Sequence, residues 1–166
     1  RYVNGIVARF EQSAVGKRFT RYFAQVVPRF FKLLHREDSR IFQGRAVPDI
    51  VKQVLSDAGI PEKAYRPVLK ATYPEREYCV QYRETALDFI LRLMEEEGIF
   101  YFFRHTASGH KLVLADATSV HTDCPGTSTL RYRENITENL TEEDVVSQVV
   151  VQEQMVTTGI AVNNYN

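Results

Sequence analysis

The sequence has few cysteines and lacks the long apolar segments from which membrane-spanning proteins are built. Its 166 residues include two cysteines, Cys79 and Cys124, and no tryptophan. Two thiols without a Cys-x-x-Cys spacing are too few for a disulfide scaffold. Cys79 lies in an apolar-polar alternation, where a small core residue is expected. No secretory signal begins the chain and no apolar run approaches ~18 residues, so we expect no stable membrane insertion.

Motifs of familiar catalytic chemistry are missing as well. There is no GxSxG elbow, no P-loop, no GxGxxG and no HExxH, so acyl transfer and nucleotide chemistry have no starting point. Glu95, Glu96 and Glu97 follow one another on a predicted helix, where neighbours point about 100° apart and cannot flank one bond. Pairing with an arginine from a neighbouring segment or subunit is the better interpretation. We expect no catalytic residues, and hence no enzyme.

A metal site has one weak candidate. His121 and Cys124 are three residues apart, with Asp116 or Asp123 close in sequence. A zinc ion needs three or four convergent ligands, and the remaining histidines have no matching spacing. We therefore expect a plain loop histidine and thiol, with no metal and no cofactor.

An excess of one charge is also lacking, because 21 basic residues balance 21 acidic ones. Nucleic-acid binding by bulk electrostatics needs an excess of Lys and Arg. Residues 1–83 nevertheless carry 16 basic and 8 acidic side chains, and the remainder carries 5 and 13. The halves either meet head to tail between copies or interleave on folding, which would cancel their fields.

One basic stretch deserves a separate hypothesis. It interleaves cations with aromatic rings, as grooves for single-stranded nucleic acid do: Arg29, Phe30, Phe31, Lys32, Arg36, Arg40, Phe42 and Arg45. The alternative is a long strand with a charged outer face, interrupted by Glu37 and Asp38. Zero net charge favours that alternative, and we expect no nucleic-acid partner.

The residues that are abundant indicate a globular, sheet-rich chain. Hydrophobic residues make up 44% of it, with 10 Phe and 9 Tyr, and aromatic side chains suit half-buried pleated surfaces. Strands are predicted over residues 3–10, with Gly5 as a bulge or close approach, and over 21–34, with Pro28 at an edge or bulge. A turn at 13–17 separates them, and the charged residues 35–44 predict a loop.

Two helices are predicted, over residues 47–58 and 85–97. Pro48 and Asp49 suit the first turn of the earlier helix, and Gly59 can close it. The later helix begins at the capping box Thr85-x-x-Asp88 and stops at Gly98. Its expected buried face consists of Leu87, Ile90, Leu91 and Met94, with Phe89 and Leu93 alongside.

Short strands are predicted over residues 65–70 and 77–82, a hairpin over 99–104 and 111–114, an irregular loop over 116–125, and late strands over 145–155 and 159–162. Antiparallel strands with two short helices indicate an α+β fold. The chain begins at Arg1 in a pattern typical of mid-strand and ends at Asn166 without a stop-like tail, so we expect residues 1–166 to be one partial domain of a larger protein.

The segment YCVQYRETALDFILRLMEEEGIFYFF, residues 78–103, resembles the hub signature of the VgrG family, the spike proteins of type VI secretion. The strand GHKLVLAD, residues 109–116, resembles the family's next strand. Upstream, residues 4–7, 27–29 and 38–43 also match. The final Asn163-Asn164-Tyr165-Asn166 is similar to a family motif that has Asp where Asn164 stands.

That resemblance implies a structural role. Family hubs are similar to contractile-phage baseplate hubs and contain two barrel-like β subdomains; three copies form a pseudo-sixfold ring on a hexameric secreted tube. The implied partners are the chain itself as a homotrimer, the tube protein, baseplate components and effectors. The implied location is the bacterial cytoplasm during assembly, followed by secretion. An N-terminal part, an oligonucleotide-binding-like domain and a needle are expected outside residues 1–166. A phage tail baseplate hub, a late-control tail protein or a cell-wall hydrolase-associated domain remain alternatives.

Overall fold

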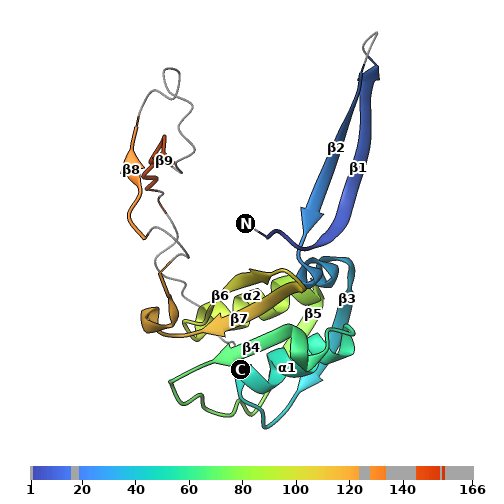
Figure 1. Ribbon diagram of the computed structural model, residues 1–166. Coiled ribbons are helices and arrows are strands. Elements are labelled where there is room, and N and C mark those ends of the chain that lie inside the picture. Colours follow the sequence, from blue (N-terminus) through green and yellow to red (C-terminus); the bar gives the residue numbers. More distant parts are fainter. Residues whose placement is uncertain (1, 16–18, 124–127, 134–144, 154, 156–166) are drawn as a thin grey trace. The chain divides into compact units, whose positions relative to one another are not determined.

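The computed structural model describes residues 2–15, 19–123, 128–133, 145–153 and 155, which belong to two compact units, 1–121 and 122–166. The helices are α1 (Val47–Asp57) and α2 (Ala86–Glu96), with three 3-10 helices, η1 (Arg29–His35), η2 (Glu62–Ala64) and η3 (Thr118–Val120). The strands, labelled in Figure 1, are β1 (Ile6–Val15), β2 (Thr20–Val27), β3 (Glu37–Phe42), β4 (Tyr65–Val68), β5 (Cys79–Thr85), β6 (Phe100–Thr106), β7 (Gly109–Ala115), β8 (Arg131–Tyr132) and β9 (Val145–Val146).

The first two strands form an antiparallel hairpin of their own. Ile6 pairs with Val27 at its base, and a bulge between Val7 and Arg9 shifts the register. Gly5 makes the close approach that was predicted: a Cβ there would lie 2.6 Å from the Val27 carbonyl oxygen. Any side chain at this position would therefore force the base of the hairpin apart.

The predicted long strand over residues 21–34 is wrong in its second half. The strand ends at Val27, and η1 follows Pro28, whose φ of −61° directs the chain into the helical turn. Phe30 and Leu33, three residues apart, are both buried. The segment is thus a strand followed by a short helix, in which Phe30 and Leu33 lie on the same side because a 3-10 helix has three residues per turn.

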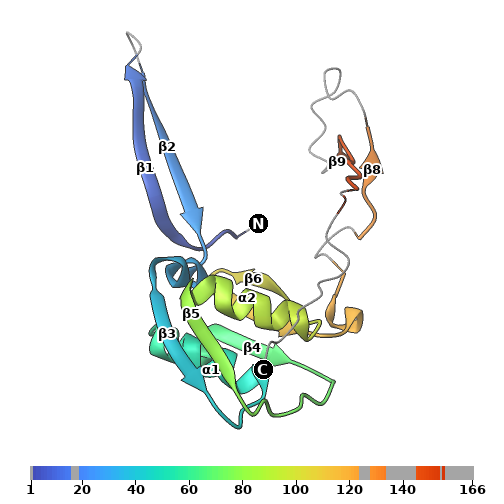
Figure 2. The same ribbon diagram turned by 180° about the vertical axis from the view of Figure 1, so that it is seen from behind.

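The loop predicted over residues 35–44 is also wrong. Residues 37–42 form β3, which pairs antiparallel with β5 (Figure 2). The charged composition misled the prediction because most of this strand's side chains are exposed, and only Phe42 is buried. Pairing with β5, more than 35 residues away in the register Phe42 with Cys79, decided the conformation, as tertiary context often does for strands.

Both predicted helices are confirmed. Thr85 caps α2: its hydroxyl accepts a hydrogen bond from the Asp88 N–H at 3.0 Å and donates one to the Asp88 carboxylate at 2.6 Å. Gly59 and Gly98 follow the two helices with φ of +71° and +69°, the left-handed conformation that ends a helix. The buried face of α2 is centred on Phe89, Ile90, Leu93 and Met94, whereas Leu87 and Leu91, which we had expected at its centre, are only partly buried.

The three-stranded sheet has the order β4-β7-β6, with β4 parallel and β6 antiparallel to β7. One of its faces carries Tyr65, Leu112 and Leu114 into the hydrophobic core, where α1, α2 and η1 also contribute side chains. Phe42 and Phe89 stack in this core with centroids 5.6 Å apart. Cys79 is buried there, and burial raises the pKa of its thiol, so the predicted core role is confirmed.

The described part of residues 122–166 contains only the short parallel pair β8-β9. The predicted strand over 145–155 is reduced to Val145–Val146, and the one over 159–162 lies outside the described residues. The α+β class with mainly antiparallel pairing is confirmed, and the described sheets have two or three strands, too few to close a barrel. Within the described residues, no helix is long and apolar enough to cross a membrane.

Candidate functional site

The acidic end of α2 is held by an arginine from the loop before β5. Arg76 donates to Glu96 at 2.7 Å and to Glu97 at 2.6 Å, and its side chain is 26% exposed. The two carboxylates raise the pKa of Arg76, and Arg76 in turn lowers the pKa of Glu96. This cation offsets the unfavourable negative charge at a helix C-terminus. The predicted arginine pairing of the glutamate run is thus confirmed for Glu96 and Glu97.

A second arginine extends this network along α2. Arg92 donates to Glu84 at 2.7 Å and to Glu96 at 3.3 Å, and its guanidinium lies over the Phe89 ring. Glu96 therefore bridges Arg76 and Arg92. Every carboxylate of this network faces a cation, so the arrangement fixes the helix to β5 and does not resemble an acid–base pair.

The predicted metal candidates do not converge. The His121 ring stacks on Phe100 at a centroid distance of 5.2 Å and lies tilted against Phe102 at 5.3 Å. The Asp116 carboxylate accepts hydrogen bonds from the backbone N–H groups of Lys70 and Ala71, each at 2.7 Å. Cys124 lies outside the described residues. Among the residues that are described, no group of three or more His, Cys, Asp or Glu side chains could hold a metal ion.

Asp116 also accepts the Tyr73 hydroxyl at 2.9 Å, a contact that the sequence did not reveal. The donated hydrogen bonds, led by the Ala71 N–H, lower the pKa of Asp116, while burial and this carboxylate raise the pKa of Tyr73 to about 12. Asp116 thus fastens the segment after β4 to the end of β7, which is a structural role.

The basic stretch over residues 29–45 does not form an aromatic platform. Phe30 and Phe42 are buried in the core. Arg40 donates to Asp57 at 2.9 Å and to Gln81 at 2.8 Å, which ties β3 to the C-terminal end of α1. Gln81 is fully buried, and its amide also donates to the Glu84 carbonyl at 3.0 Å. Phe30, Arg40 and Phe42 therefore hold the fold together, whereas Arg29 and Arg45 line two different clefts.

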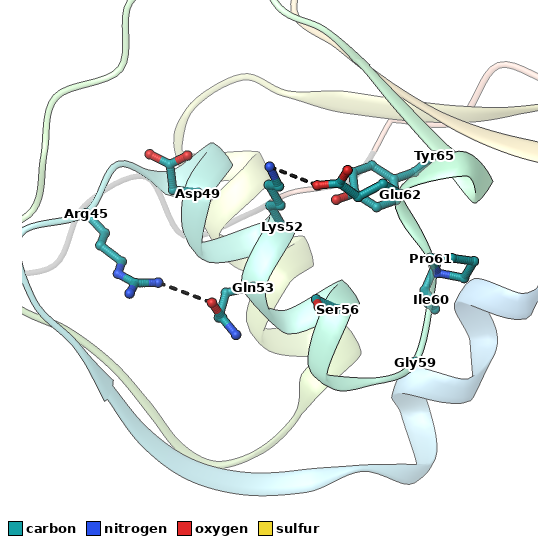
Figure 3. A pocket seen from close by; sticks show the side chains of 10 residues that line it. All are labelled: Arg45, Asp49, Lys52, Gln53, Ser56, Gly59, Ile60, Pro61, Glu62 and Tyr65. Carbon is teal, nitrogen blue, oxygen red and sulfur yellow. Dashed lines mark hydrogen bonds and ion pairs between the residues drawn. The ribbon is translucent and has the colours of Figure 1, made fainter.

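A shallow cleft of about 540 Å³ runs beside α1 (Figure 3). Its charged residues are two cations and two acids, Arg45, Lys52, Asp49 and Glu62, and Lys52 pairs with Glu62 at 3.0 Å. The buried Tyr65 hydroxyl has no hydrogen-bond partner among the described groups. Because its charges cancel, this cleft has no evident selectivity for a ligand of either sign.

One face of the β1-β2 hairpin carries a cluster of exposed apolar side chains. The pairing register places its members on the same side, with exposed fractions of 59% for Val7, 64% for Phe10, 58% for Tyr22 and 49% for Val26. The Phe10 and Tyr22 rings stack at 5.7 Å. A two-stranded hairpin is marginally stable alone, and a clustered apolar patch marks an interaction surface. The alternation in the sequence could have indicated the face but not its exposure.

Two histidines attach this hairpin to the tip of the β6-β7 hairpin. His105 Nδ1 accepts the N–H of Asn4, just before β1, at 3.0 Å, and His110 Nε2 accepts the N–H of Arg29, just after β2, at 3.2 Å. The two histidines pair across β6 and β7. Each bond requires an unprotonated ring nitrogen, and neither role had a signal in the sequence.

Comparison with known proteins agrees with this structural picture. The family model described as phage tail baseplate hub (GPD) matches residues 1–166. The type VI secretion system spike protein VgrG1c of Pseudomonas aeruginosa is 46% identical over 132 residues, covering 80% of this chain and 18% of the relative. The actin cross-linking toxin VgrG1 of Vibrio cholerae is 43% identical over 116 residues, which are 70% of this chain and 10% of that protein.

A solved structure shows the same fold. The Escherichia coli c3393 protein, described as a component of the type VI secretion system with structural similarity to the T4 bacteriophage tail proteins gp27 and gp5, superposes with a TM-score of 0.70 at 28% identity. The match covers 74% of this chain and 35% of that one. The chain spans between 10% and 20% of the length of these curated relatives. It belongs, over residues 1–166, to the phage tail baseplate hub family.

Proposed function

We propose that this chain is part of the structural hub of a type VI secretion spike, which adapts a trimeric needle to a hexameric secreted tube and so serves effector delivery. The observation that carries the proposal is the 46% identity to the spike protein VgrG1c over 80% of the chain. A hub needs fixed geometry, and the ion pairs around Arg40, Arg76 and Arg92 supply it.

The proposed partners are a homotrimer of the longer polypeptide, the tube protein, baseplate components and effectors. The apolar face of the β1-β2 hairpin supports an assembly role, since exposed patches of this kind mark protein contacts. We further propose assembly in the bacterial cytoplasm, followed by secretion with the spike to the exterior or a target cell. Neither nucleic acid nor stable membrane insertion is part of this proposal.

A phage tail baseplate hub is the second candidate function. The family description names it, and the solved relative is described as similar to phage tail proteins. The type VI spike proteins at 45–48% identity favour the secretion system. Sequencing the gene beyond Asn166 separates the two, because a needle-like β domain supports the spike and a lysozyme-like insert supports the phage hub.

Sedimentation velocity of the longer polypeptide tests the assembly directly. We expect a trimer, with at most a weak trimer for residues 1–166 alone, because hub copies in this proposal are also joined through the needle. A longer polypeptide that sediments as a monomer would overturn the hub assignment.

We also propose that this chain has no catalytic activity of its own. The carboxylates of the α2 network face cations, and among the described residues no metal-binding cluster occurs. Purified chain should match blanks on peptidoglycan and on generic ester and phosphate substrates. Turnover that disappears on substitution of one residue would contradict this.

A further inference from the structure

The outer face of the β4-β7-β6 sheet gathers positive charge. Arg104 and Lys111 pair directly across β6 and β7, and Arg66 of β4 pairs with Val113, two residues from Lys111. Side chains two residues apart on a strand share a face, so these three cations lie on the side opposite the core residues Leu112 and Leu114. All three are exposed.

Two hollows share Arg104 in their lining, and we call them together the basic cleft. The larger, of about 820 Å³, is lined by Arg29, Lys63, Arg104 and Lys111. The smaller, of about 270 Å³, is lined by Arg66, Lys70 and again Arg104. The other lining residues of both hollows are polar or apolar, and none is an aspartate or glutamate.

These six cations are not neutralised by the described part of the chain. None of them takes part in an ion pair between described residues. Arg104 donates to the Val120 carbonyl at 3.2 Å, and Lys70 donates to the Ser119 hydroxyl at 2.7 Å. The nearby carboxylate of Asp116 is occupied by two backbone amides and Tyr73. Within the described residues, the cleft therefore gathers positive charge that no carboxylate pairs with.

The cleft beside α1 shows that a lining with cations and no acidic residue is not a general property of clefts on this surface. That cleft has equal numbers of acids and cations, and its Lys52 already pairs with Glu62. A cleft lined by one sign of charge focuses the field and attracts the opposite charge. The basic cleft is thus suited to an anionic ligand, whereas the α1 cleft is not.

We propose that the basic cleft binds a carboxylate-rich polypeptide segment of a partner protein. Its arginines can pair in bidentate fashion with carboxylates, and its lysines add point charges along the same path. Single-stranded nucleic acid fits less well because it needs open aromatic faces for base stacking. The rings on this sheet face already contact other side chains: His121 stacks on Phe100 and lies tilted against Phe102, and Arg104 lies over Phe102. This inference does not depend on the proposed spike function.

Fluorescence anisotropy on the full 166-residue chain provides the test. The probes are a fluorescein-labelled peptide of about ten residues rich in glutamate, the same peptide with glutamine at each glutamate, and an oligothymidylate of about ten nucleotides. The glutamate peptide should bind, and its affinity should fall steeply as salt is raised, because exposed charges are screened. The glutamine peptide and the oligothymidylate should bind at least about tenfold more weakly.

Charge reversal locates the binding. Lys63→Glu and Lys111→Glu should each weaken binding of the glutamate peptide about tenfold or more, since each replaces attraction with repulsion. The matched control is Lys32→Glu, an exposed lysine on η1 that lines neither hollow, and it should change affinity by no more than about twofold. Unchanged melting temperatures would show that all three variants fold. Equal losses in the control, tighter binding of the oligothymidylate, or no binding of the glutamate peptide at low salt would each overturn the proposal.

Discussion

The packed part of unit 1, from η1 to β7, and the β1-β2 hairpin use similar side chains in opposite ways. In the packed part, Ile50, Leu55, Phe89 and Leu93 have no exposed surface. In the hairpin, Val7, Phe10, Tyr22 and Val26 are about half exposed or more. The buried residues recur at helical spacing on α1 and α2, which pack together with the sheet in one core, whereas the exposed ones lie on two paired strands that carry no helix of their own.

The largest expected effect comes from the buried face of α2. Leu93→Ala should lower the free energy of unfolding by about 2–5 kcal/mol, because it leaves a cavity at a fully buried site. Tyr22→Ala on the hairpin should change it by no more than about 0.5 kcal/mol, as exposed substitutions do. Urea denaturation measures both.

Leu91→Ala is the matched control within the helix, since Leu91 is only partly buried. It should cost clearly less than Leu93→Ala. Equal costs at the two leucines would mean that the outer side of α2 is covered, and a large cost at Tyr22 would remove the contrast between the two regions.

Gly5→Ala should disturb the hairpin while leaving the packed part intact. The new Cβ would lie 2.6 Å from both Val26 Cγ1 and the Val27 carbonyl oxygen. Overpacking of this kind costs about 1–3 kcal/mol, and here it falls at the hairpin's base. Hydrogen exchange should become faster at the amides of β1 and β2, with α2 unchanged. Faster exchange in α2 as well would show that the two regions unfold as one.

A smaller effect is expected from Arg76→Ala, which removes both hydrogen bonds to Glu96 and Glu97. We expect a loss of about 1–2 kcal/mol, in the range of hydrogen bonds to charged groups discounted for partial exposure. Arg83→Ala is the control, because Arg83 makes no described ion pair. A loss that persists undiminished in high salt would indicate that packing, and not charge, is responsible.

The smallest effect is a dependence on pH at the attachment of the hairpin. Burial, and then His105 and Arg29, lower the pKa of His110 below its ordinary value of 6.5. The unfolded chain therefore takes up the proton first as pH falls. Stability should be complete above pH 6.5 and should decline as pH drops through 6.5 toward the lowered pKa.

Melting temperatures between about pH 8 and 5.5 measure this decline, a window in which imidazole titrates. His110→Gln offers an acceptor oxygen to the Arg29 N–H without titrating, so it should show a flatter profile. An unchanged profile in this variant would assign the pH dependence to other groups.

Local signals predicted the helices well and the strands less well. Pro48 and Asp49, the capping pair Thr85 and Asp88, and the glycines at the helix ends each act over a few residues, so the sequence contains their full physical cause. β3 could not be predicted in this way because its exposed, charged residues become a strand only through pairing with β5.

The contacts at the candidate surfaces join residues that are even farther apart in the sequence. His110 is 81 residues from Arg29, and His105 is 101 residues from Asn4. No pattern of spacing reports such pairs. The basic cleft likewise combines η1, η2 and three strands, and its residues are unremarkable one by one. The family resemblance was the part of the function that the sequence showed directly.

The attachment of the hairpin at both ends has a mechanical consequence. Asn4 and Arg29 enter and leave the hairpin, and each backbone amide is tied to a different strand of the β6-β7 tip. A force applied along the hairpin would act on both hydrogen bonds at once instead of breaking them one after the other. Because bonds that share a load yield at a higher force than bonds that break in turn, we expect the two imidazole contacts to resist separation of the hairpin from the β6-β7 tip.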